Sequence, residues 1–181
     1  MSLDPGRPTL YLMVGLPGAG KTTRARELER ERRALRLTPD EWMLPLFGAS
    51  DVDGARDVLE GRFVWLARRA LAAGTDVVLD FGLWGRDERS ALRALAAEVS
   101  AFCVLVWLPV DEQTQRQRVL ARFDREPEET FVMTDDDLVR YREAFEPPTD
   151  DEFGDVVDDA PAGFEGWPQW IAVRWPSAGT D

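Results

Sequence analysis

The sequence predicts an α/β fold, a three-layer α/β/α sandwich built around a parallel sheet of about five strands. Short apolar runs alternate along the chain with longer segments of helical periodicity, and this order is typical of parallel sheets covered by helices. The run at 101–108 is almost entirely apolar, as expected for a strand buried on both faces. We expect a single domain over residues 1–181, with a core at about 9–145 and an acidic C-terminal segment at 146–181 that includes an edge strand.

The expected elements alternate in type along the chain. Strands are expected at 9–14, 34–37, 77–80, 101–108 and 170–175. Helices are expected at 22–33, 39–47, 54–74, 90–100, 111–125 and 135–145. Pro8 and Gly15 bound the first strand, and Asp111 and Thr134 are N-caps for the last two helices.

Two helices have specific local signals. Thr38 and Glu41 have the spacing of a capping box at the start of helix 39–47, with Pro39 suited to the first helical position. Segment 54–74 carries apolar residues at three- and four-residue steps, which indicates one buried helical face. Four arginines of this helix are expected on its solvated face: Arg56, Arg62, Arg68 and Arg69.

The composition excludes several kinds of site. The chain has no His and one Cys, Cys103, which excludes a His-ligated metal, a Ser-His triad, an internal disulfide and a thiolate zinc cluster. The net charge of −12 disfavours a nucleic-acid groove, because such a groove has to neutralise phosphates. No apolar run approaches the ~18 residues of a membrane helix and no leader resembles a signal peptide, so we expect a cytoplasmic protein.

A glycine-rich loop follows the first strand. Residues 15–22 fit G-x-x-x-x-G-K-[ST] in full, between a strand and a helix, as this phosphate-binding loop (P-loop) requires. Of the 22 basic residues 21 are Arg, and the single Lys is Lys21 in this loop. Lys21 is expected to reach the β- and γ-phosphates of ATP, and Thr22 to ligate Mg²⁺. The nucleotide-binding residues expected here are Gly15, Leu16, Pro17, Gly18, Ala19, Gly20, Lys21, Thr22 and Thr23.

Missing motifs exclude several nucleotide-binding classes. The chain has no Asn and no second Lys, so the N-K-x-D motif of GTPases is absent. Strand 77–80 ends in Asp-Phe, whereas an AAA+ motor needs Asp-Glu there and a further helical domain. The letters of Asp80-Phe81-Gly82 occur in protein kinases, but the H-R-D loop and the V-A-I-K strand of those enzymes are absent. A small-molecule or nucleoside-type kinase remains.

Three further motifs follow the loop at 15–22: Thr38-Pro39-Asp40-Glu41, Asp80-Phe81-Gly82-Leu83-Trp84, and an arginine-bearing helix at 111–125. In this order they resemble the P-loop kinase group that includes zeta toxins, chloramphenicol phosphotransferase, gluconate kinase and the kinase domain of polynucleotide kinase. The resemblance covers roughly residues 9–125. Residues 145–149 also resemble uncharacterised bacterial ATP-binding members of this group.

The resemblance implies roles for two residues on the acceptor side, Asp40 and Asp80, and Arg86 is a third candidate from its position after them in the chain. In these kinases an Asp at the place of Asp40 accepts the proton of the attacking hydroxyl, and open α/β sheets bind ligands at such strand ends. Asp80 is expected to hold substrate or the water shell of the metal, although Phe81-Gly82 replaces the Thr-Asn of polynucleotide kinases. Arg86 is expected to bind an anionic group of the acceptor, or to pair with Asp87 or Glu88.

The resemblance also implies an arginine-bearing lid that closes over the γ-phosphoryl group. Arg118 and Arg122 are four residues apart and share one helical face. Arg122 is the main candidate, with Arg118 as a second catalytic arginine and Arg125 as a nucleotide-binding one. A charged surface helix, balanced by neighbouring acids, is the alternative.

Together these observations predict ATP- and Mg²⁺-dependent transfer of the γ-phosphoryl group to a hydroxyl of a small-molecule acceptor. The expected catalytic residues are Lys21, Asp40, Arg118 and Arg122. Three alternatives stay open: a 5′-hydroxyl polynucleotide kinase, a toxin-like kinase acting on a nucleotide sugar, and a non-catalytic ATP-binding regulatory protein. The sequence leaves the acceptor and the oligomeric state open.

Overall fold

Four parallel strands form the central sheet of the computed structural model, which describes residues 6–48, 52–125, 133–154 and 156–179. The strands are β1 (Thr9–Val14), β2 (Leu35–Leu37), β3 (Val77–Leu79) and β4 (Phe102–Trp107). Their order is β2-β3-β1-β4, and every neighbouring pair is parallel. The carboxyl ends of all four strands therefore meet at one edge of the sheet, where open α/β sheets bind ligands.

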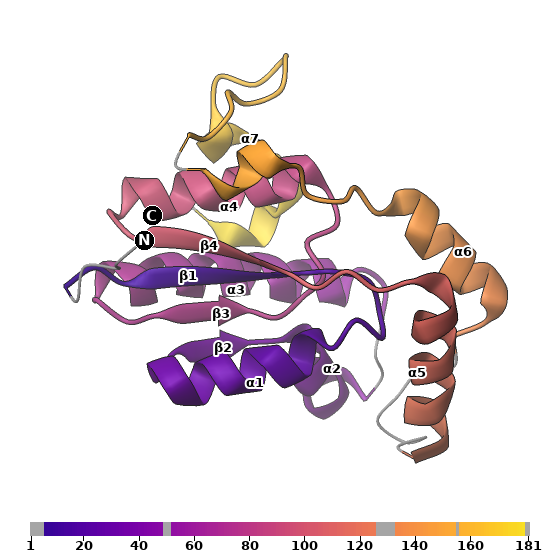
Figure 1. Ribbon diagram of the computed structural model, residues 1–181. Helices are drawn as coiled ribbons and strands as arrows, with labels where there is room; N and C mark the ends of the chain where they lie inside the picture. The colour runs from indigo at the N-terminus through magenta and orange to yellow at the C-terminus, as the bar shows by residue number, and fades with distance from the viewer. Residues whose placement is uncertain (1–5, 49–51, 126–132, 155, 180–181) are drawn as a thin grey trace.

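Helices lie on both faces of the sheet, which confirms the predicted sandwich (Figure 1). They are α1 (Lys21–Arg32), α2 (Pro39–Phe47), α3 (Ala55–Ala72), α4 (Arg86–Glu98), α5 (Glu112–Arg125), α6 (Asp135–Ala144) and α7 (Trp167–Arg174). Short 3-10 helices lie at Asp150–Phe153, between α6 and α7, and at Pro176–Ala178, after α7. In Figure 1, α5 and α6 lie beyond the carboxyl end of the sheet rather than over either face.

The two faces of β1 take part in two separate cores, because successive side chains of a strand point to opposite faces. Leu10 and Leu12 belong to the larger core, together with apolar residues of α3, α4 and the C-terminal segment. Tyr11 and Met13 belong to the smaller one, which α1 covers through Ala25 and its neighbours. Every residue of β1 is buried, so the P-loop begins at the end of a fully buried strand.

The predicted fifth strand at 170–175 is wrong, because these residues form most of α7. Gly166 and Pro168 at the start of this segment favour a helix, since Pro is well tolerated in the first turn. Apolar side chains follow the i, i+3, i+4 spacing of one helical face at Trp167, Trp170 and Ile171. Through these side chains α7 packs on α4. The sheet accordingly has four strands among the described residues, with β4 at one edge.

The start of α2 differs from its prediction in one contact. Pro39 is the first residue of the helix, as predicted, but the Thr38 side chain makes no capping hydrogen bond. Glu41 accepts hydrogen bonds from Arg36 at 2.5 Å and Arg26 at 3.0 Å instead. Two charged donors from neighbouring elements therefore replace the capping box.

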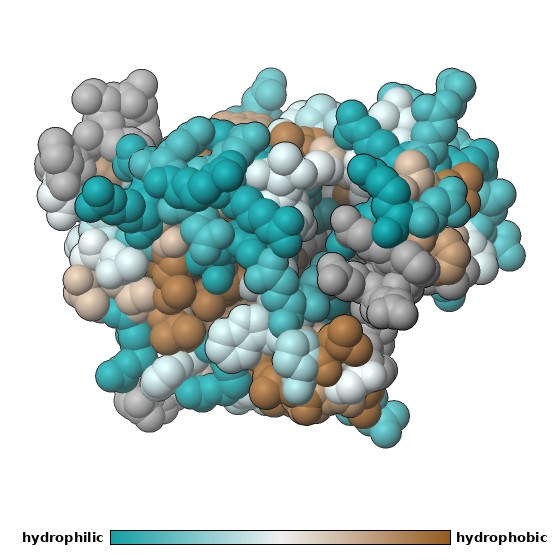
Figure 2. Space-filling view, turned by 90° about the horizontal axis from the view of Figure 1, so that it is seen from below, coloured by the Kyte–Doolittle hydropathy of each residue, from teal (hydrophilic) through white to brown (hydrophobic). Residues whose placement is uncertain are grey.

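The surface over α1 and α2 is of mixed polarity (Figure 2). Helix α1 consists mainly of Arg and Glu, whereas α2 exposes several large apolar side chains: Trp42, Leu44, Leu46 and Phe47. None of the helices in the described part of the chain is both long and apolar enough for a membrane span.

Candidate active site

The P-loop joins β1 to α1 and needs glycine at two positions for different reasons. A Cβ on Gly15 would lie 2.8 Å from the carbonyl oxygen of Leu108, which no side chain permits. Gly18 has a φ of +79°, and a Cβ there would lie 3.1 Å from the carbonyl oxygen of Gln115. The loop thus runs against the chain at the end of β4 and against α5 with no room for side chains.

The loop residues divide into two groups in the structure. Leu16 and Ala19 are buried, and the Ala19 N–H donates to the Leu16 carbonyl to close the turn at 3.1 Å. The others, except Gly15, line a cleft at the carboxyl edge of the sheet: Pro17, Gly18, Gly20, Lys21, Thr22 and Thr23. The cleft has a volume of about 1720 Å³, which exceeds the roughly 300–1,000 Å³ of a pocket for one small ligand.

Lys21 opens α1 at the base of this cleft. Its ammonium donates to the Leu16 carbonyl at 3.0 Å, within the loop itself. Burial lowers the pKa of Lys21 to about 8, against the opposing influence of the carboxylates of Asp80 and Asp40. A buried ammonium at a helix N-terminus, beside a backbone cradle, fits an anionic polyphosphate.

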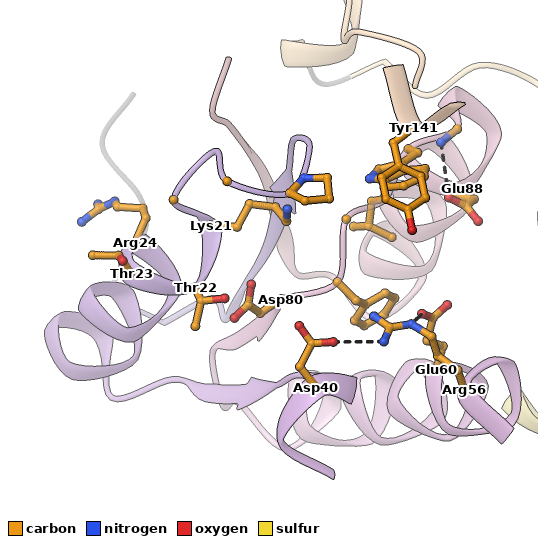
Figure 3. A pocket seen from close by; sticks show the side chains of 18 of the residues that line it. Lys21, Thr22, Thr23, Arg24, Asp40, Arg56, Glu60, Asp80, Glu88 and Tyr141 are labelled. Carbon is orange, nitrogen blue, oxygen red and sulfur yellow. Dashed lines mark hydrogen bonds and ion pairs between the residues drawn. The ribbon is translucent and has the colours of Figure 1, made fainter. Parts of the chain in front are cut away.

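Asp80 lies directly after β3 and faces Thr22 across the floor of the cleft (Figure 3). Its side chain is 1% exposed and accepts a hydrogen bond from Arg36 Nη1 at 3.2 Å. Burial raises the pKa of Asp80, while Arg36, Lys21 and the Thr22 hydroxyl favour its charged form. A hydroxyl and a carboxylate are hard oxygen ligands, and Mg²⁺ commonly binds through one or two protein oxygens together with phosphates. The donor set therefore fits Mg²⁺ bound with ATP.

Asp40 is close to the start of α2 and points into the same cleft (Figure 3). Its side chain is 46% exposed, and it accepts from Arg56 Nη1 at 3.0 Å. Arg56 also contacts Glu60 at 3.2 Å, one turn further along α3. Arg56 was expected on the solvated face of its helix; its side chain is 34% exposed, and it lines the cleft, where it joins the two carboxylates.

Helix α5 brings the three expected lid arginines to the opposite wall of the cleft. Arg118 Nη1 donates to the carbonyl of Gly18 in the P-loop at 3.2 Å. Arg122 is near enough to Lys21 that its positive charge contributes to the lowered pKa of that ammonium. Arg125 donates to the carbonyl of Ala121 within α5. Helix α5 therefore contacts the P-loop directly.

Arg86 begins α4 and turns toward the C-terminal segment. Its guanidinium contacts Asp151, and lies 2.6 Å from Asp158 and 2.7 Å from the Thr149 hydroxyl. These acids raise its pKa well above the ordinary value. The expected pairing with Asp87 or Glu88 does not occur, because residues more than 60 positions away in the chain supply the carboxylates.

A cluster of charged side chains that the sequence did not indicate occupies the far side of the cleft. Glu60 from α3 and Glu88 from α4 converge on Arg174 of α7, at 4.0 Å and 2.8 Å. Glu60 is 12% exposed, and burial raises its pKa to about 7 even though Arg56 and Arg174 oppose the shift. The i,i+4 spacing of Arg56 and Glu60 is visible in the sequence, but the sequence does not show that both side chains face the cleft.

Charge is unequally distributed in the cleft. Among the described residues, the side built by the P-loop, α1 and α5, which we call the phosphate side, has one carboxylate, Glu27, and six cations: Lys21, Arg24, Arg26, Arg118, Arg122 and Arg125. The described cations of the other side, which is built by α2, α3, α4 and the chain after α6 and which we call the acceptor side, are Arg56, Arg86 and Arg174. Its described carboxylates are Asp40, Asp57, Glu60, Asp87, Glu88 and Glu146. Asp80 lies between the two sides.

The fold of this chain is similar to that of known proteins. A family model described as an AAA domain matches residues 10–148. A structure of the Pnkp1/Rnl/Hen1 RNA repair complex is similar at 19% identity and a TM-score of 0.66, covering 76% of this chain and 44% of that chain. This chain thus spans less than half of that relative.

Two further structures match over most of their length. Chaetomium thermophilum Kti12 in complex with ADP-AlF3 is 18% identical, with a TM-score of 0.63 and coverage of 94% of this chain and 100% of that chain. A gluconokinase from Sinorhizobium meliloti 1021 is 16% identical, with a TM-score of 0.53 and coverage of 96% and 91%. These matches confirm the predicted resemblance to P-loop kinases at the level of the fold, which by itself does not define an activity.

Proposed function

The chain belongs to the AAA-domain family whose model matches residues 10–148, and from this premise we propose that it transfers the γ-phosphoryl group of ATP to a hydroxyl of a small-molecule acceptor. One observation carries the proposal. Lys21 and Thr22 of the P-loop, Asp80 after β3 and Asp40 on α2 all face a single cleft (Figure 3). That cleft has room for a second ligand beside a nucleotide.

The residues of the phosphate side would bind and orient ATP. Backbone N–H groups of the P-loop and the ammonium of Lys21 would hold the β- and γ-phosphates, and Thr22 with Asp80 would hold Mg²⁺. The guanidiniums of Arg118 and Arg122 would neutralise charge on the transferred group, with Arg125 further along α5. Contact of Arg118 with Gly18 supports this role, because it ties the lid to the loop that holds the phosphates.

Asp40 is the group that would orient the acceptor. Its carboxylate would accept the hydroxyl proton as the oxygen bonds to phosphorus. Bound MgATP supplies the γ-phosphoryl group, whose bond to the bridging oxygen breaks so that ADP leaves with the electron pair. The ion pair with Arg56 would hold the Asp40 side chain in place, since a positioned carboxylate is more effective than a mobile one.

The test is acceptor-dependent release of ADP, measured with a panel of hydroxyl compounds at saturating ATP and Mg²⁺. The wild-type chain is expected to release ADP with at least one compound, and Lys21→Ala to lose this activity by orders of magnitude while staying folded. Arg30→Ala, an exposed substitution on the same helix outside the cleft, is the matched control. Undiminished transfer by Lys21→Ala would contradict the proposal.

A nucleotide-binding regulatory protein is the second candidate. The match to Kti12 in complex with ADP-AlF3, which spans 94% of this chain, is compatible with it, because that complex is described by its nucleotide and no acceptor is named with it. Such a protein would bind ATP but release no ADP in response to any acceptor. A 5′-hydroxyl polynucleotide kinase fits less well, since the acceptor side is lined mainly by carboxylates, which repel a phosphate backbone.

A further inference from the structure

The arginines on the acceptor side of the cleft are already paired with carboxylates, unlike the arginines of a site that binds anions. Each of these three guanidiniums already lies against carboxylates within the chain: Arg56 against Asp40 and Glu60, and Arg174 against Glu60 and Glu88. Arg86 is directed to the C-terminal segment. An acceptor with a phosphate or carboxylate group would have to displace one of these partners.

The described carboxylates of this side outnumber its guanidiniums. Glu60 and Glu88 are only 12% and 19% exposed, and they share the guanidinium of Arg174, while Glu60 also contacts Arg56 at 3.2 Å. The raised pKa of Glu60, to about 7, has burial as its main cause, and the two nearby arginines only partly offset it. A cation placed beside Glu60 would therefore gain a favourable interaction that the chain itself does not complete.

Aromatic side chains line the same side. The rings of Trp84 and Tyr141 are tilted by 56° with their centroids 5.1 Å apart, and those of Trp170 and Trp175 are edge-to-face with their centroids 5.8 Å apart. All four rings line the cleft. Aromatic faces next to carboxylates are a recurrent environment for organic cations, which are attracted by the electron-rich face of a ring.

Two indole N–H groups give a second, independent indication of a ligand. Trp175 is 0% exposed, and its Nε1 has no hydrogen-bond partner among the described residues. Trp84 Nε1 is likewise buried and unpartnered within that part of the chain. Buried donors usually have an acceptor, and oxygen atoms of a bound ligand would supply it.

We propose that the acceptor is a small polyhydroxylated amine of the amino-sugar class, with its ammonium group beside Glu60 and Glu88. This inference rests on the proposed function and names the substrate class of that same site. The ammonium donates to carboxylates on α3 and α4, and the hydroxyl and ring oxygens accept from the indoles. One hydroxyl is thereby placed toward Asp40 and the phosphate side.

The experiment compares probes of one size and different charge. Glucosamine, galactosamine and 2-deoxystreptamine are the amines, glucose and myo-inositol are uncharged, and glucuronate is the acid. Binding is measured by tryptophan fluorescence at neutral pH in the full chain saturated with ADP, and ADP release is measured with ATP. At least one amine is expected to bind tenfold or more tightly than every uncharged probe, with glucuronate weakest.

Glu60→Gln tests the site itself. This variant is expected to lose most of the preference for amines, whereas Glu98→Gln on α4, outside the cleft, is expected to keep it. Equal or tighter binding of uncharged or acidic probes overturns the inference, as does failure of all three amines to bind. Amine binding without any ADP release would refute the proposed function and leave the site intact. ADP release only with an uncharged or acidic probe would support the proposed function and overturn the inference of an amine acceptor.

Discussion

The buried ion pair between Arg89 and Glu152 allows a quantitative prediction. Both side chains are at most 1% exposed, and the guanidinium donates to the two carboxylate oxygens at 2.7 Å and 2.9 Å. Its remaining Nη1 donates to the carbonyls of Leu83 and Trp84 at 3.2 Å and 3.0 Å. The pair thus joins α4, the loop after β3 and the C-terminal segment.

Glu152→Gln keeps the size of the side chain and removes its charge, which leaves the guanidinium of Arg89 buried without a counter-ion. Breaking a buried pair in this way costs about 3–5 kcal/mol. For a domain of this size, that corresponds to a fall in Tm of about 6–20 °C. Chemical denaturation and calorimetry measure both quantities.

The control is Glu98→Gln at the end of α4, the helix that carries Arg89. It removes the carboxylate of an exposed ion pair with Arg68 of α3, at 3.7 Å. Exposed pairs contribute about 0–1 kcal/mol, so this variant is expected to resemble the wild type. The double variant Arg89→Met with Glu152→Met is expected to recover only part of the loss, because the two carbonyls then lack a donor. A Glu152→Gln variant no less stable than Glu98→Gln would refute the reasoning.

Three further predictions concern the cleft. Asp40→Asn should bind ATP but lower acceptor-dependent ADP release by about 10²–10⁴-fold, and an unchanged rate would remove Asp40 from the site. Because the pKa of Glu60 is raised to about 7 in the fold, the free energy of unfolding should decrease as pH rises from 4.5 through 7, by about 3 kcal/mol. Glu60→Gln should lack this dependence, and denaturation curves at several pH values test it. Arg36→Met removes the ion-pair partner of the buried carboxylate of Asp80 and should cost about 3–5 kcal/mol, whereas Arg26→Met, at an exposed pair, should cost less than about 1 kcal/mol.

Elements with strong local signals were predicted well. Helix 39–47 was placed at its observed bounds, and strand 101–108 exceeds the observed β4 by one residue at each end. The caps at Asp111 and Thr134 were also predicted. Each of these side chains accepts a hydrogen bond from the backbone N–H three residues further along the chain. Apolar runs, periodicity and caps act within a few residues, so the sequence displays them directly.

Contacts between distant segments could not be predicted in the same way. Residues 170–175 have an apolar composition that suits a strand or a helix, and most of them form helix α7, which packs on α4. Arg56 was expected in solvent because its helix has one apolar face, but it lies at the end of α3 that borders the cleft. The partners of Arg86 come from a segment more than 60 residues away.

The sequence by itself determined the phosphate side of this protein, since the P-loop is a continuous stretch whose strand, glycines, Lys21 and helix are local features. Only the tertiary structure decided the acceptor side, where α3, α4 and α7 bring Glu60, Glu88 and Arg174 together. The physical reason is that burial and pairing of charges depend on which distant segments exclude water from a site. The order of residues along the chain does not show which distant segments will lie side by side.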